Sequence, residues 1–354
     1  MEKTMRKQRF LTFFLLICLL LPLASCTGRK NKYTVQSFDY FDTVAAITGY
    51  EKNKKSFDKV SGEIFALLGE YHKLFDIYNS YDGIKNLCDV NSLVGGVHPV
   101  LTVDERIIDM LLYAKDMHKY TDGKMNIAMG SVLSVWHRYR TEGTASPESA
   151  SLPPMGKLTE AAKHTEINNL IIDTEKNTVW LSDPEMTLDV GAIAKGYAVE
   201  KVAEKLTENG ITGYVINVGG NVRAVGCKPD GEKWSVGIEN PDVLSSKAYV
   251  AMLSLSDKAV VTSGAYQRFY TVGGKKYHHI IDPETLMPAE RYLSVSVVCK
   301  DSGAADALST ALFCMPYEKG IALVEGMSDT EAIWVMTDGS ERTSSGFYNC
   351  IEHN

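Results

Sequence analysis

The feature that most constrains the fold of this chain is a series of short strand-like runs in its second half. These runs cover residues 213–218, 221–226, 233–239, 248–255, 258–262, 267–273, 276–281 and 292–299. Stretches with helical apolar spacing include residues 57–74, about 193–206 and about 303–315, and the polar stretch 141–157 predicts a surface loop. Consecutive strands with few intervening helices favour an α+β fold over a doubly wound parallel sheet.

The N-terminal residues have the layout of a secretory signal peptide. Basic residues come first, followed by an apolar run over residues 11–23 that is too short to span a bilayer. The sequence Leu23-Ala24-Ser25-Cys26 is similar to the lipobox of bacterial lipoproteins, which are cleaved before a cysteine that is then acylated. A cysteine placed there by chance is the alternative. We expect a signal peptide over residues 1–25, a polar tether over residues 26–37, and a lipid anchor on Cys26 at the extracytoplasmic face of a bacterial cell membrane.

The charge and the cysteines of the chain exclude some classes of function. Cleavage before Cys26 would remove four basic residues and Glu2, which changes the formal net charge from −7 to −10. An acidic surface argues against nucleic acid as a partner. The later cysteines are scattered without a C-x-x-C pair, so neither a zinc ribbon nor a redox motif is predicted. They are Cys88, Cys227, Cys299, Cys314 and Cys350, and their odd number leaves at least one thiol unpaired within the chain.

A first candidate site lies where a strand-like run ends at Asp189 and a predicted helix begins a few residues later. Gly191 allows a tight turn there, and the backbone N–H groups at a helix start favour a phosphate group. Lys195 falls in the first helical turn, where the helix dipole opposes a cation unless an anion such as a diphosphate is bound. The alternative is that Asp189 caps the helix and Lys195 is a solvated surface residue.

A second candidate is the pair Gly219 and Gly220 between two strand-like runs. Such a pair permits either a plain hairpin turn or a close approach of the backbone to a ligand. The surrounding sequence is not G-x-G-x-x-G and no helix follows, which excludes a dinucleotide fingerprint of the Rossmann type.

A third candidate is the adjacent pair His278 and His279 in a strand-like run, where the two side chains face opposite sides. One of them can point into a cleft and act as a general base near neutral pH, while the other packs or meets solvent. A purely structural role for both histidines is the alternative.

The fourth candidate is formed by Asp306 and Thr310, which are four residues apart and share one face of a predicted helix. The rest of that helix is small or apolar, so it should be buried, and a buried carboxylate needs a partner such as a metal ion. One carboxylate and one hydroxyl suit Mg²⁺, which keeps water ligands and binds substrate phosphates. The alternative is that Asp306 caps the start of the helix.

Taken together, these stretches resemble the motifs of the ApbE family, the FAD:protein FMN transferases. The matching stretches are D-V-G-A-I-A-K-G-Y-A from Asp189, N-V-G-G-N-V-R-A from Asn217, T-S-G-A-Y-Q-R-F-Y from Thr262, Y-H-H-I-I-D-P-E-T from Tyr277 and A-D-A-L-S-T-A from Ala305. Tyr78, residues 41–43 and residues 125–130 resemble its N-terminal motifs. Phe41-Asp42-Thr43 stands where the family more usually has Met-Gly-Thr, and Asn126 stands where Asp is common.

The resemblance implies one catalytic domain over residues 38–345, with an α+β fold of paired β-α-β units and mostly antiparallel sheet around an FAD cleft. The FAD contacts that it implies are Phe41, Tyr78, Lys124, Met125, Asn126, Asp189, Lys195 and Ile280, with Gly219 and Gly220 near the diphosphate. The implied Mg²⁺ ligands are Asp306, Thr310 and the Ala192 carbonyl, and the implied general base is His279.

The implied reaction is a Mg²⁺-dependent transfer of FMN from FAD to a Ser or Thr hydroxyl of a partner protein, which forms a phosphoester and releases AMP. The expected acceptors are exported subunits of membrane redox complexes or extracytoplasmic flavoproteins. A flavin-carrying lipoprotein without turnover is one alternative, but it would not need Asp306, Thr310 and His279 together. An FAD pyrophosphatase, which would use water in place of the hydroxyl, is the other, and it could use the same site.

Overall fold

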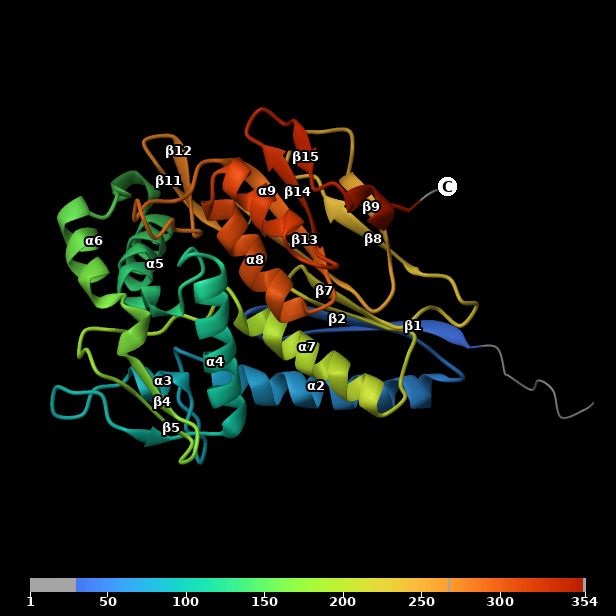
Figure 1. Ribbon diagram of the computed structural model, residues 1–354, viewed down its shortest axis with the longest axis horizontal. Helices are drawn as coiled ribbons and strands as arrows, with labels where there is room; N and C mark the ends of the chain where they lie inside the picture. Colours follow the sequence, from blue (N-terminus) through green and yellow to red (C-terminus); the bar gives the residue numbers. More distant parts are fainter. Residues whose placement is uncertain (1–29, 267, 353–354) are drawn as a thin grey trace, which may run out of the picture.

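The computed structural model describes residues 30–266 and 268–352 (Figure 1). The predicted signal peptide and the predicted lipidation site Cys26 lie outside these residues. Within the described ranges, no helix combines the length and the apolar character needed to cross a membrane.

The centre of the molecule is an eight-stranded sheet with the strand order β1-β2-β6-β7-β10-β13-β14-β15. All of its neighbouring strands are antiparallel. The strands are β1 (Asn31–Tyr40), β2 (Thr43–Glu51), β6 (Tyr214–Val218), β7 (Asn221–Val225), β10 (Ala259–Gly264), β13 (Tyr292–Cys299), β14 (Glu331–Met336) and β15 (Glu341–Thr343). Inner strands are apolar on both faces, so that Val261 of β10 packs in one core and Val260 in another.

Helices cover one face of this sheet and a hairpin covers the other. The helices α2 (Lys54–Phe75), α7 (Ala194–Glu208) and α8 (Ser302–Cys314) pack together on the first face, where the larger apolar core lies (Figure 1). The antiparallel pair β8 (Trp234–Glu239) and β9 (Tyr249–Leu255) packs on the opposite face. Helix α8 is buried over most of its length, as its small and apolar sequence predicts.

A second group of elements stands beside the sheet. It includes α3 (Leu87–Asn91), α4 (Glu105–Tyr120), α5 (Gly130–Ala145), α6 (Met155–Ala161), β3 (Leu101–Thr102), β4 (Leu170–Asp173), β5 (Thr178–Leu181), β11 (Phe269–Val272) and β12 (Lys275–His278), while α9 (Tyr317–Glu325) packs against β14. Short 3₁₀ helices lie at residues 127–129, 147–149, 162–164, 167–169 and 347–350. Trp136 of α5 and Tyr270 of β11 belong to a separate apolar cluster that joins α5, α6 and the β11–β12 hairpin.

The predicted α+β fold is confirmed, because helices pack on an antiparallel sheet. Two local predictions change. Residues 31–37, assigned to the tether from their polarity, form the first part of β1, because they pair with β2. Residues 141–157 are not one continuous loop, because α5 extends to Ala145 and α6 begins at Met155.

Candidate active site

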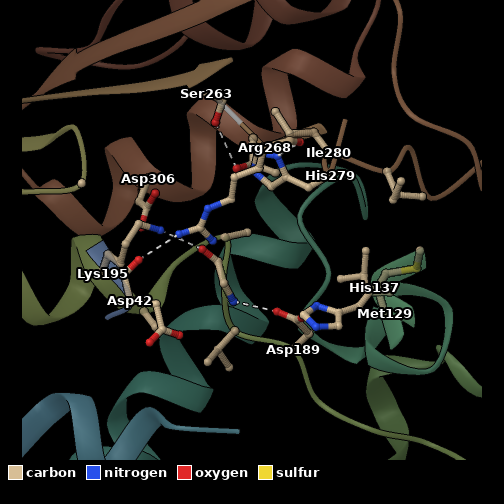
Figure 2. Close-up of a pocket in the computed structure, with 18 of the residues that line it drawn as sticks. Asp42, Met129, His137, Asp189, Lys195, Ser263, Arg268, His279, Ile280 and Asp306 are labelled. Carbon is tan, nitrogen blue, oxygen red and sulfur yellow. Dashed lines mark hydrogen bonds and ion pairs between the residues drawn. The ribbon is translucent and has the colours of Figure 1, made fainter. Parts of the chain in front are cut away.

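A cleft of about 560 Å³ brings the candidate residues together. It lies between hairpin ends of the main sheet, the start of α7, the middle of α8, and a wall with residues of α5 and β12. Figure 2 shows Lys195, Asp306, Asp189 and His279 around this space. The predicted site residues that line it are Phe41, Tyr78, Lys124, Met125, Asn126, Asp189, Ala192, Lys195, Gly219, His279, Ile280, Asp306 and Thr310. Among the predicted site residues that the structure describes, Gly220 does not line the cleft. Motifs far apart in the sequence therefore share one site, although the role of each residue stays a prediction.

The start of α7 holds a cation and a carboxylate side by side. The N-cap residue Ile193 gives no side-chain hydrogen bond, and Asp306 of α8 takes over, because its Oδ2 accepts the N–H of Gly196 at 2.9 Å. The Lys195 ammonium lies 3.7 Å from the same oxygen and donates to the carbonyl of Gly191 at 3.0 Å. Gly196 permits this approach, because a Cβ there would collide with α8. An anion placed here would meet both Lys195 and the helix N-terminus.

Neither of the two acidic candidates caps its own helix. The N-cap of α8 is Asp301, whose Oδ1 accepts N–H groups of the first turn, and Asp306 lies further along the helix. Asp189 precedes the N-cap of α7, and its Oδ1 accepts the N–H of Gly191 at 2.9 Å, which shapes the turn before the helix. Burial raises the pKa of Asp189, so a donor or cation brought by a ligand would stabilise its charged form.

The oxygen atoms around Asp306 fit a hard divalent cation that takes few protein ligands. Thr310 lies one turn later on α8, and its hydroxyl is 3.3 Å from the hydroxyl of Ser263. In the described part of the chain, no three side chains of His, Cys, Asp or Glu are grouped as a metal site. Asp306, Thr310 and Ala192 line the same cleft, and a carboxylate, a hydroxyl and a backbone carbonyl are ligands that Mg²⁺ would accept, since it completes its shell with water and substrate phosphates.

The two adjacent histidines have different surroundings at the end of β12. His278 is buried, and its Nε2 donates to the carbonyl of Ala289 at 2.7 Å while its Nδ1 accepts the N–H of Ile280 at 3.2 Å. His279 follows the strand, and its Nδ1 is 3.2 Å from the carbonyl oxygen of Arg268 (Figure 2). Because a carbonyl oxygen only accepts, the neutral His279 ring carries its proton on Nδ1. Its Nε2 therefore has a lone pair available for a proton.

The charge state of His279 follows from its place in the cleft. Burial, together with the positive charges of Arg268 and Arg140, lowers the pKa of His279 to about 3, although its hydrogen bond to the Arg268 carbonyl opposes the shift. The ring is consequently neutral at pH 7, which is the form that a general base needs.

Lys124 has its charge balanced within the protein. Its ammonium is buried and lies 2.8 Å from Asp282 and 3.0 Å from Glu284. Burial alone would lower the pKa of Lys124, but these two carboxylates raise it. Asn126 also has internal partners, because its Oδ1 accepts the N–H of Ala128 and its Nδ2 donates to the Thr165 carbonyl. These contacts fix the segment that carries Lys124, Met125 and Asn126 against the cleft.

Two hairpin turns meet at the sheet side of the cleft. Phe41 and Asp42 join β1 to β2 with φ values of 55° and 50°. Gly219 and Gly220 join β6 to β7 with φ values of 59° and 87°, and Thr43 lies so close to Gly219 that a Cβ there would have no room. The glycine pair therefore forms a hairpin turn, and the backbone of Gly219 lies at the cleft wall.

Several lining residues were not predicted from the sequence. Arg140 lies on α5 and Arg268 precedes β11, and burial together with the neighbouring Arg268 lowers the pKa of Arg140. His137, His72 and Asp76 also line the cleft. Arg268 falls inside a stretch that resembles a family motif, so a signal for it was present. The others lie on or beside helices, and their approach to the cleft depends on packing that no local pattern indicates.

Fold and site together define a class of protein: an α+β protein whose ligand-sized cleft places a neutral histidine, a lysine–aspartate pair and oxygen donors around one space. Comparison with known proteins gives this class a name. The model of the ApbE family matches residues 41–334. An FAD:protein FMN transferase of Treponema pallidum is 30% identical over an alignment of 355 positions, which covers 95% of this chain and 94% of that protein. The chain belongs to the ApbE family.

Further relatives agree in sequence and in structure. An FAD:protein FMN transferase of Klebsiella pneumoniae is 31% identical over 279 residues, which are 78% of this chain and 82% of that protein. The crystal structure of the ApbE protein of Thermotoga maritima superposes with a TM-score of 0.78 at 26% identity, and covers 91% of this chain and 100% of its own. The flavin transferase ApbE of Vibrio cholerae gives 0.73 at 26% identity with the same coverage.

Proposed function

We propose that this chain is an FAD:protein FMN transferase that moves FMN from FAD to a Ser or Thr hydroxyl of a partner protein and releases AMP. The observation that carries the proposal is the single cleft that holds a neutral His279 with a free Nε2 together with the Lys195–Asp306 pair at a helix start. The names of the relatives support the same reaction.

In this proposal the acceptor oxygen displaces AMP from the FMN-side phosphorus in one step, and different residues bind, orient and deprotonate the reactants. His279 Nε2 takes the proton of the acceptor hydroxyl as its oxygen attacks the FMN-side phosphorus of FAD. The phosphorus–oxygen bond toward the AMP half breaks, AMP leaves with the bridging oxygen, and the acceptor keeps FMN in a phosphoester. Lys195 and the N–H groups at the start of α7 bind the diphosphate, and the closeness of the groups orients the reactants.

The proposal includes Mg²⁺, because Asp306, Thr310 and the Ala192 carbonyl provide the oxygen donors that this ion prefers. Bound there, Mg²⁺ would offset charge on the diphosphate and on the leaving AMP.

We also propose a location. The lipobox-like sequence before Cys26 supports a lipid anchor on the extracytoplasmic face of a bacterial membrane. The acceptors would then be exported proteins or exposed subunits of membrane redox complexes.

The test is to incubate the protein with FAD, Mg²⁺ and candidate acceptors, and to measure the intact mass of the acceptor and the AMP released. We expect the acceptor to gain the mass of FMN less one water for each AMP released, and both products to be lost when Mg²⁺ is chelated. Release of AMP and free FMN with no labelled acceptor would instead identify an FAD pyrophosphatase. Tight FAD binding without AMP would identify a carrier.

A further inference from the structure

The wall of the cleft contains a turn with an unfavourable backbone conformation. The proposed reaction does not explain which contacts hold this turn in place. Phe41 and Asp42 join β1 to β2 with both residues in the left-handed region, which residues with a side chain rarely adopt. Such conformations persist where surrounding contacts hold them, and they concentrate at functional sites. Both residues line the cleft, so the shape of its wall depends on this turn.

Two side chains contact the backbone of the turn: the Arg268 guanidinium donates to the Asp42 carbonyl at 3.4 Å, and His72 of α2 holds Phe41. The N–H of Phe41 donates to His72 Nδ1 at 3.2 Å, and the two rings meet edge to face with centroids 5.5 Å apart. Because a backbone N–H only donates, Nδ1 is the acceptor and the neutral ring carries its proton on Nε2. That Nε2 lies 3.4 Å from the hydroxyl oxygen of Tyr81, which donates its own proton to Asp76 Oδ2 at 2.7 Å.

Asp76 ends this chain of hydrogen bonds and joins it to a second part of the cleft wall. Its Oδ1 accepts the N–H groups of Tyr78 at 2.7 Å and Asn79 at 3.0 Å. Burial alone would raise the pKa of Asp76, but the hydrogen bonds from Tyr78, Tyr81 and Asn79 lower it. Burial and the Asp76 carboxylate raise the pKa of Tyr81 to about 12, so its hydroxyl stays a donor. The donor and the acceptor of each hydrogen bond in this series are therefore fixed.

We propose that His72 is a positioning residue: with Tyr81 and Asp76 it fixes the strained Phe41–Asp42 turn and the Tyr78 segment as one preformed wall for FAD. The inference rests on the proposed function, because Phe41 and Tyr78 are predicted FAD contacts. The chain of hydrogen bonds sets the distance between the two segments before FAD enters. Its loss therefore weakens FAD binding and leaves proton transfer at His279 intact.

The first experiment compares His72→Ala, His72→Asn and Tyr81→Phe with the wild type. FAD affinity is measured by titration, and KM for FAD and kcat are measured by acceptor labelling. We expect His72→Ala and Tyr81→Phe to raise Kd and KM for FAD about tenfold, with kcat at saturating FAD within about twofold. His72→Asn should lie closer to the wild type, because the Asn Oδ1 can accept the Phe41 N–H. Tyr120→Phe, at an exposed tyrosine outside the cleft, serves as the control.

The second experiment tests the strain itself. Glycine adopts a positive φ without steric cost, so Asp42→Gly should remove the strain at one of the two turn residues and make the turn less dependent on His72. We expect Asp42→Gly to restore most of the FAD affinity when it is added to His72→Ala. If His72 only stabilised helix α2, Asp42→Gly in the turn would not restore the FAD affinity of His72→Ala. Thermal unfolding of each variant confirms that the compared proteins are folded.

The outcomes separate this inference from the proposed function. If the wild type binds FAD and labels an acceptor but His72→Ala and Tyr81→Phe bind FAD equally well, this inference is wrong and the function stands. A fall in kcat with unchanged FAD affinity, or no rescue by Asp42→Gly, also overturns it. If the wild type itself neither binds FAD nor labels an acceptor, the proposed function is wrong.

Discussion

His279 is the residue on which the proposed proton transfer depends most directly. We expect His279→Ala to reduce the labelling rate roughly 10²–10⁴-fold, the usual contribution of a general base. FAD affinity should change little, because Nε2 is free to meet the nucleophile while Nδ1 contacts the Arg268 carbonyl. In-gel flavin fluorescence of the acceptor, with a parallel FAD titration, measures both quantities.

The neighbouring histidine provides the matched control. His278→Ala removes buried hydrogen bonds to Ala289 and Ile280, so it should lower the free energy of unfolding by about 1–3 kcal/mol. The folded fraction of this variant should still label the acceptor. Full labelling by His279→Ala, or a catalytic loss confined to His278→Ala, would show that the wrong histidine has been assigned.

The lowered pKa of His279 predicts an unusual pH dependence. A solvated imidazole would lose its basic form as the pH falls through about 6.5. Because the pKa of His279 lies at about 3, its ring stays neutral as the pH falls through that range. We therefore expect no acid limb near pH 6.5 in kcat/KM for the acceptor, with the limb of His279 displaced toward pH 3. A limb near 6.5 that disappears in His279→Ala would contradict this prediction.

Asp306 tests the metal part of the proposal. Asp306→Ala removes the only carboxylate among the proposed Mg²⁺ ligands, so the labelling rate should fall roughly 10²-fold or more even at high Mg²⁺. Mg²⁺ titration of the labelling rate measures this effect, and Asp116→Ala, at an exposed position on α4, is the control. Near-normal turnover of Asp306→Ala with an ordinary Mg²⁺ dependence would exclude the assignment.

At the scale of elements, the crossing of α7 and α8 joins the lysine and the carboxylate of the site. Gly196→Ala would push a methyl group into the Ser302 carbonyl and the Asp306 side chain. We expect a loss of about 1–3 kcal/mol in the free energy of unfolding, measured with urea, together with weaker FAD binding. Gly62→Ala is the matched control, because it also lies inside a helix but has open space around it, and it should be neutral or slightly stabilising. Equal behaviour of the two variants would show that the crossing tolerates a side chain.

The sequence predicts the inner strands well and the edges poorly. Residues 258–262 and 292–299 are apolar because β10 and β13 are covered on both faces, so their sequence alone indicates strands. β1 was missed, because it is an edge strand whose residues are mostly exposed or half-buried, and its polar sequence reads like a tether. Helix α5 has a weak apolar face, and its buried residues pack in the cluster shared with α6 and the β11–β12 hairpin, so its end is hard to predict from the sequence.

The site divides in a similar way. Asp189, Lys195, His279 and Asp306 stand in motifs where polar residues interrupt apolar runs, and the structure brings them into one cleft. His72 and Arg140 have no such signal, because each belongs to a helix and reaches the cleft through tertiary packing. The sequence also does not reveal that Lys124 already has carboxylate partners, because Asp282 and Glu284 are far away along the chain.

At the scale of the whole molecule, the proposed anchor is separable from catalysis. Cys26 lies before the described residues, and the cleft is lined by residues from Phe41 onward. We expect Cys26→Ser to move the protein from the membrane fraction to the soluble fraction while kcat and KM for FAD stay unchanged. Cell fractionation with salt washing, followed by the labelling assay, measures both. A Cys26→Ser protein that stays in the washed membranes would contradict the anchor.

The direction of β1 also bears on which acceptors are within reach. The strand enters the sheet at Asn31 and ends at Tyr40, immediately before the turn that lines the cleft (Figure 1). Ten extended residues span about 30 Å, so β1 would be a rigid spacer between a lipid-anchored N-terminus and the cleft. In a lipid-anchored enzyme, this spacer would set the distance between the membrane surface and the cleft. Hydroxyl groups on loops that project from the bilayer would be modified, whereas those at the level of the lipid headgroups would be too close to the surface to enter.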